Sequence, residues 1–138
     1  MIGLDTNVLL RWLIDEALWP EDSRGQMAAA KQLIECDETF FVNLIVLAET
    51  VWVLQNPLRQ SKQVVLDLVD RLLGASNVVI DQRDTVIAAC AGYRAGKPGF
   101  TDHLIGHANR QAGCRTTVSF DKGTRRSGVF TRLDPLRS

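Results

Sequence analysis

Short apolar runs alternate along this chain with longer segments whose apolar residues recur at helical spacing, and this alternation limits the possible folds most strongly. The short runs predict strands at residues 2–5, 39–43, 77–80, 116–120 and 128–133. The longer segments predict helices at residues 6–15, 21–36, 44–55, 60–74, 83–96 and 101–113. Strands interleaved with helices predict a three-layer α/β/α fold around a central, mainly parallel sheet.

The size and composition of the chain are those of one globular domain. Its 138 residues are 46% hydrophobic and contain no internal repeat or linker, so we expect a single domain over residues 1–138. No apolar run approaches the roughly 20 residues of a membrane-spanning helix. Asp5 and Arg11 interrupt the apolar start, which argues against a signal peptide. The three cysteines show neither disulfide nor metal-site spacing, which predicts reduced thiols in a cytoplasmic protein.

Four acidic residues stand out because each lies beside apolar segments where a charge needs an explanation. They are Asp5, Glu49, Asp102 and Asp121. Asp5 and Asp121 each follow a predicted strand, and Asp102 lies in the first turn of a predicted helix. Structural explanations exist for three of them: an N-cap for Asp5, a partner of the helix dipole for Asp102, and a turn residue for Asp121.

Glu49 is harder to explain as a structural residue. Ile45, Val46, Trp52 and Val53 lie three or four positions from it and share its face of the predicted helix. This helix is apolar on nearly every side, which predicts that Glu49 is buried. A buried carboxylate without a partner is strongly unfavourable. We therefore expect a partner for Glu49, either a buried Arg or Lys or a metal ion.

The predicted topology allows the four acids to meet. In open parallel sheets, ligands bind at the carboxyl ends of the strands, and all four acids can face that edge. Clustered carboxylates repel each other unless a divalent cation neutralises them. Oxygen ligands favour Mg²⁺ or Mn²⁺ over zinc. Two such ions about 3.5–4 Å apart can activate water and stabilise the leaving oxygen in phosphodiester cleavage.

Four segments of the chain resemble, in order, the motifs of PIN-domain proteins, in particular the VapC-type toxins of bacterial type II toxin–antitoxin systems. These segments are GLDTNVLLRWL, VNLIVLAETVWVL, FTDHLIGHAN and TTVSFDKG. The resemblance implies a PIN-like fold and a metal-dependent endoribonuclease. It places Asp5, Glu49, Asp102 and Asp121 at the family's catalytic positions, where they would hold Mg²⁺ or Mn²⁺.

The resemblance also implies supporting residues and partners. Thr6 and Asn7 match the small polar residues after the first aspartate, and Ser119 lies where it can steady Asp121. The implied chemistry is in-line attack of activated water, which leaves 5′-phosphate and 3′-hydroxyl ends on the RNA. The implied assembly is a homodimer that a small antitoxin neutralises, often by inserting an Arg into the acidic site.

The charge distribution gives a weaker indication of how RNA would bind. The net charge is zero, but basic residues outnumber acidic ones after Asp121. These cations form either a solvated C-terminal tail or a surface that contacts phosphates. The candidate RNA-binding residues are Arg11, Lys97, Lys122, Arg125 and Arg126.

Other functions remain open from the sequence alone. A non-catalytic PIN-like module that binds RNA or protein is the main alternative. A phosphatase of haloacid dehalogenase type also begins with an aspartate after the first strand, but its second aspartate is replaced by Asn7. His103 and His107 have the i, i+4 spacing of some zinc sites, although packing or partner contact is the favoured role. Trp12 and Trp52 are expected in the core, and Trp19 on the surface.

Overall fold

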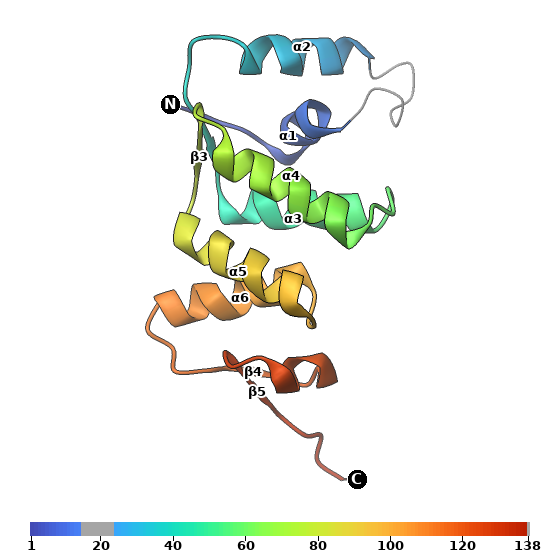
Figure 1. The fold of residues 1–138 in the computed structure, drawn as a ribbon, viewed down its shortest axis with the longest axis vertical. Helices are drawn as coiled ribbons and strands as arrows, with labels where there is room; N and C mark the ends of the chain where they lie inside the picture. The colour runs from blue at the N-terminus through green and yellow to red at the C-terminus, as the bar shows by residue number, and fades with distance from the viewer. Residues whose placement is uncertain (15–23, 138) are drawn as a thin grey trace. The chain divides into compact units, whose positions relative to one another are not determined.

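The computed structural model describes residues 1–14 and 24–137 (Figure 1). Their packing forms two compact units. Unit 1 comprises Met1–Asp81 and unit 2 comprises Gln82–Ser138. Both contain parallel strands and helices, which confirms the predicted α/β class. Whether the two units form the single domain expected over residues 1–138 stays a prediction. Within the described ranges, no helix is long and apolar enough to cross a membrane.

Unit 1 is built on a parallel sheet with the strand order β1-β2-β3. The strands are β1 (Ile2–Gly3), β2 (Phe40–Val42) and β3 (Val78–Ile80). In the central strand β2, Phe40 and Val42 are fully buried. The helices of this unit are α1 (Thr6–Leu13), α2 (Arg24–Ile34), α3 (Leu44–Gln55) and α4 (Lys62–Gly74).

Side-chain caps determine where three helices of unit 1 begin. Asp5, Asn43 and Ser61 each accept a hydrogen bond from the backbone N–H three residues later, over 3.0, 2.8 and 3.2 Å. Such caps satisfy backbone donors that the first helical turn leaves without partners. Asp5 therefore follows β1 by two residues and begins α1, so its carboxylate lies near the carboxyl end of that strand.

Unit 2 combines a pair of helices with a pair of parallel strands. The helices are α5 (Arg83–Ala95) and α6 (Phe100–Gln111), and the strands are β4 (Thr117–Ser119) and β5 (Phe130–Arg132). A 3-10 helix, η3 (Lys122–Arg126), lies between the two strands. The helices pack so closely that a Cβ added to Gly92 would lie 2.5 Å from Nδ1 of His103.

The observed elements are shorter than the predicted ones, mainly at their ends. The start of the helix predicted at 101–113 is wrong by one residue, because α6 begins at Phe100 and Gly99 occupies the cap position. The helix predicted at 21–36 is described from Arg24 to Ile34, while its start and Trp19 lie outside the described residues. The three cysteines are free thiols.

Candidate active site

Unit 1 contributes the first pair of candidate acids. Asp5 is exposed, and its Oδ1 accepts the hydrogen bond from the backbone N–H of Val8. The adjacent Thr6 donates its hydroxyl proton to Oε2 of Glu49 over 2.8 Å. This bond joins the first turn of α1 to the middle of α3 and orients the Glu49 carboxylate. The cap reading of Asp5 is therefore correct, and its second oxygen is not used by the cap.

The predicted burial of Glu49 is wrong. Glu49 is exposed, and its observed partner is the Thr6 hydroxyl instead of a buried cation. Ile45 and Trp52 on the same face of α3 are also exposed, by 70% and 58%. The core position expected for Trp52 is likewise wrong. Trp12 is half-buried, and the guanidinium of Arg71 lies 5.4 Å from its ring centre.

Unit 2 contributes the second pair, Asp102 and Asp121. Burial raises the pKa of Asp102 above its ordinary value, and the negative charge of Asp121 raises this pKa further. The charge of His103 and a backbone hydrogen bond at Gly99 act in the opposite direction but are smaller effects. The two carboxylates therefore share a local environment in which their charges repel each other.

The loop around Asp121 is held by a set of short-range hydrogen bonds. Oδ1 of Asp121 accepts from the backbone N–H of Gly123 over 2.8 Å. The backbone N–H of Asp121 donates to Oγ of Ser119 over 3.1 Å. Its carbonyl oxygen accepts from the hydroxyl of the fully buried Thr124 over 2.7 Å. Ser119 thus contacts the backbone of Asp121, and the turn reading of Asp121 is correct.

The oxygen atoms of the candidate acids are chemically suited to bind a hard divalent cation. The candidate ligands are carboxylates, with a hydroxyl beside them, and Mg²⁺ and Mn²⁺ prefer such oxygen donors. A bound cation would reduce the electrostatic repulsion between Asp102 and Asp121. In the described ranges, no group of three or more His, Cys, Asp or Glu residues is close enough to hold a metal. Asp102 and Asp121 interact electrostatically in unit 2, and in unit 1 the Thr6 hydroxyl next to Asp5 contacts Glu49.

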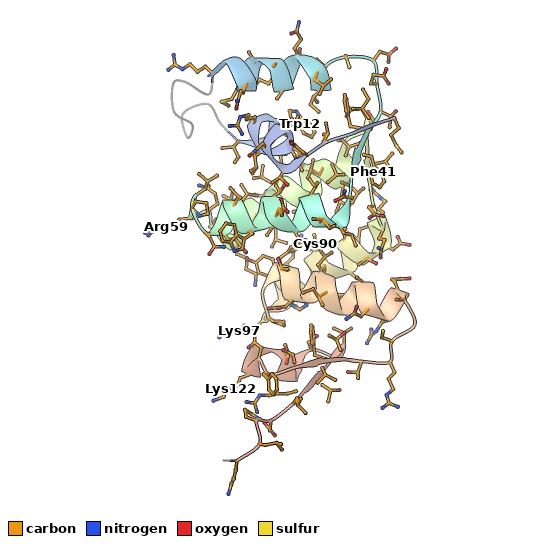
Figure 2. The ribbon with its side chains drawn as sticks, turned by 180° about the vertical axis from the view of Figure 1, so that it is seen from behind. Trp12, Phe41, Arg59, Cys90, Lys97 and Lys122 are labelled. Carbon is orange, nitrogen blue, oxygen red and sulfur yellow. The ribbon has the colours of Figure 1, made fainter. Side chains whose placement is uncertain are left out.

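The remaining predicted residues are distributed over both units. Asn7 is exposed, and its carbonyl oxygen accepts a hydrogen bond of 3.2 Å from Nη1 of Arg11. Lys97 and Lys122 are exposed in unit 2 and extend to the same side of it (Figure 2). The side chains of Arg125 and Arg126 lie outside the described part of the structure.

Unit 2 also contains a cleft of about 970 Å³ that the sequence analysis does not predict. We call it the basic cleft, after its cations Lys97, Arg110 and Lys122. His103, His107 and Arg110 form one of its walls, because the spacing i, i+4, i+7 places them on one face of α6. That spacing is visible in the sequence, but the prediction covered only the two histidines and did not include Arg110.

The pKa of His107 is affected by the positive charges that surround the basic cleft. Burial lowers its pKa from the ordinary value, and the positive charge of Arg110 lowers this pKa further, followed by that of His103. The imidazole of His107 is therefore neutral at neutral pH. His103 is 4% exposed, and its Nε2 lies 3.3 Å from the carbonyl oxygen of Gly96, in the loop that carries Lys97. This packing position agrees with the favoured reading of His103.

Comparison with known proteins identifies the family. No protein with a curated description matches the chain. Among solved structures, the chain is similar to VapC20 of Mycobacterium tuberculosis, described as a sarcin–ricin loop cleaving toxin. The identity is 15% and the TM-score 0.43, over 98% of this chain and 100% of that one. The family model of the PIN domain matches residues 2–128, which run across both units. The chain therefore belongs to the PIN-domain family.

Proposed function

We propose that this protein is a metal-dependent endoribonuclease that acts as the toxin of a toxin–antitoxin pair. Membership of the PIN-domain family, a family of nucleases, supports the general class of activity. The observation that carries the metal-dependent reading is the raised pKa of Asp102, because the nearby negative charge of Asp121 contributes to it. Two carboxylates that repel each other at neutral pH form a site that gains stability from a cation.

Asp5, Glu49, Asp102 and Asp121 are the residues that we propose hold Mg²⁺ or Mn²⁺. The chemistry that the bound metal supplies is activation of water and stabilisation of the leaving oxygen at a phosphodiester. The polar neighbours of the acids set their orientation. The Thr6 hydroxyl fixes one oxygen of Glu49, and the backbone N–H of Gly123 fixes one oxygen of Asp121. Each of these carboxylates keeps a second oxygen for the metal.

The proposed partners follow from the motifs that resemble VapC-type toxins. They are an RNA substrate, a small cognate antitoxin and a second copy of the chain. The exposed acids Asp5 and Glu49 are accessible in unit 1 to a cationic group of such an antitoxin. The favoured alternative, a non-catalytic PIN-like module, differs from this proposal in that RNA would be bound without being cut.

The proposed function is tested by incubating purified protein with total cellular RNA in Mn²⁺, Mg²⁺ or EDTA. We expect discrete fragments with the metals and none in EDTA. Asp102→Asn should reduce the cleavage rate about 100-fold or more. Removing a residue that only supports a metal ligand lowers activity about 10–100-fold, and removing a ligand should lower it further. The matched control is Asp37→Asn, which removes an exposed acid outside both pairs. Equal cleavage by wild type and Asp102→Asn, or cleavage that persists in EDTA, would contradict the proposal.

A further inference from the structure

We infer that the basic cleft of unit 2 is the site that binds the phosphate backbone of the RNA strand. This inference rests on the proposed function for the identity of the ligand, but the cleft itself is a feature of the fold. Its lining brings together Lys97, Arg110 and Lys122 from three different elements or loops. Their convergence on one hollow creates a local positive charge in a chain whose net charge is zero.

The cations of the basic cleft are available to a ligand. In the described part of the chain, Lys97 and Lys122 form no ion pair, and both side chains are exposed. Arg110 donates one hydrogen bond, from Nη2 to the carbonyl oxygen of Gly128 over 3.1 Å. This bond orients the guanidinium, which has five N–H donors, and leaves further donors for phosphate oxygens.

The basic cleft adjoins one of the proposed metal ligands. Gly123 lines the cleft, and its backbone N–H donates to the carboxylate of Asp121. Lys122 lies between these two residues in the chain, and Cβ of Lys97 lies 3.7 Å from where a Cβ on Gly123 would be. A strand held by Lys97 and Lys122 therefore passes the carboxylate of Asp121, so the cleft would hold phosphates near the bond to be cut.

The other lining residues favour the backbone of RNA over its bases. Among the lining residues that the structure describes, none is Phe, Tyr or Trp, the larger platforms for base stacking, and the ring of His103 is buried. Most of the remaining lining residues are small, namely the glycines, Ala95 and Ser127. A volume of about 970 Å³ is near the upper end of ligand pockets and exceeds what a single phosphate needs. A strand whose charges repeat along its length fits this space, and we expect it to bind with little sequence preference.

The test measures binding of a fluorescein-labelled single-stranded RNA of mixed sequence by anisotropy, with the full chain in EDTA so that no metal-dependent cleavage occurs. The variants are Lys97→Ala, Lys122→Ala, and the charge-conserving Lys97→Arg and Lys122→Arg. The matched control is Arg115→Ala, which removes an exposed cation of the same unit outside the cleft lining. Each affinity is measured over a series of salt concentrations.

Each alanine variant should weaken binding about fivefold in 0.1 M salt and reduce the slope of log K against log salt by ~0.7, the value for one phosphate contact on a single strand. The arginine variants and Arg115→Ala should bind like the wild type. Unchanged affinity and slope in both alanine variants would overturn the inference. So would tight binding of poly-glutamate with no binding of RNA, because the cleft would then recognise an acidic polypeptide.

The outcomes separate this inference from the proposed function. One outcome is that the wild type binds RNA without cutting it and the lysine variants lose this binding. That result would support RNA binding by the basic cleft and contradict the nuclease activity. Wild-type cleavage with unchanged binding and cleavage by both lysine variants would contradict the cleft and leave the nuclease supported.

Discussion

At the scale of single residues, the bond between Thr6 and Glu49 determines how one proposed metal ligand is oriented. Thr6→Val removes the hydroxyl that donates to Oε2 of Glu49 while keeping a side chain of similar shape. We expect metal-dependent RNA cleavage to fall about 10–100-fold, as is usual when a metal ligand loses its supporting hydrogen bond. Thr6→Ser keeps a hydroxyl and should retain most of the activity. Initial rates over a metal titration give the measurement, and equal rates for Thr6→Val and wild type would contradict the assigned role.

Asp102 gives a second residue-scale prediction, on the pH dependence of stability without metal. Its pKa in the folded chain is raised, so its protonated form stabilises the fold below the ordinary pKa of 3.8. That stability is lost as the pH rises through the raised pKa. In EDTA at neutral pH, Asp102→Asn should therefore have a higher Tm than the wild type, and the difference should vanish at acidic pH.

Thermal melts of both proteins across the acidic range test this prediction. The same melts with saturating Mg²⁺ provide the control, because the metal should stabilise the wild type more than Asp102→Asn. A wild type that is more stable than Asp102→Asn in EDTA at neutral pH would show that the Asp102 carboxylate does not experience the repulsion.

The positions of the candidate acids relative to the helices and strands were predictable from the sequence, but their surroundings were not. Asp5, Asp102 and Asp121 adjoin predicted element ends, so their positions follow from the alternation of strands and helices. The exposure of Glu49 did not follow, because an apolar sequence shows that a helix has surfaces to bury but not which faces pack. The bond from Thr6 connects residues 43 positions apart, and no local pattern reports such a contact.

At the scale of elements, the contact between α5 and α6 depends on Gly92. A Cβ there would lie 2.5 Å from Nδ1 and 2.8 Å from Cε1 of the buried His103 ring. Gly92→Ala should therefore destabilise the fold by about 1–3 kcal/mol, the usual cost of overpacking. Gly74→Ala is the matched control, since nothing lies within 4 Å of its added Cβ.

Urea unfolding of both variants measures this difference. Gly92→Ala should lower the free energy of unfolding less in a His103→Ala background than in the wild type, because the clashing ring is then absent. A Gly92→Ala protein as stable as Gly74→Ala would show that the helices are not packed this closely.

The existence of the elements was predictable, and their ends were less so. Caps such as Asn43 and Ser61 mark helix starts because their side chains bond to the backbone three residues later. The start of α6 was misplaced because Thr101 resembles a cap, whereas the structure uses Gly99, which has no side chain to reveal it. The basic cleft was missed because its cations come from separate elements that packing brings together.

At the scale of the whole molecule, we expect a divalent metal to stabilise the chain. A metal that binds the folded protein alone contributes about 2.7 kcal/mol when present at 100 times its Kd. Mg²⁺ or Mn²⁺ should therefore raise the Tm by several degrees, and a monovalent salt of equal ionic strength should not. Calorimetric melts over a metal titration test this, and a Tm that is unchanged up to millimolar metal would contradict a metal site.

Mn²⁺ binding by the proposed ligands is the property on which the proposed function depends most, and calorimetric titration measures it directly. Isothermal titration would compare wild type, Glu49→Gln, Asp102→Asn and the double variant, with Asp37→Asn as the control. Wild type and Asp37→Asn should bind Mn²⁺ equally well, whereas Glu49→Gln and Asp102→Asn should each lose about tenfold or more in affinity, because each removes a proposed ligand. Mn²⁺ affinity that is unchanged in the double variant would contradict the proposed metal site.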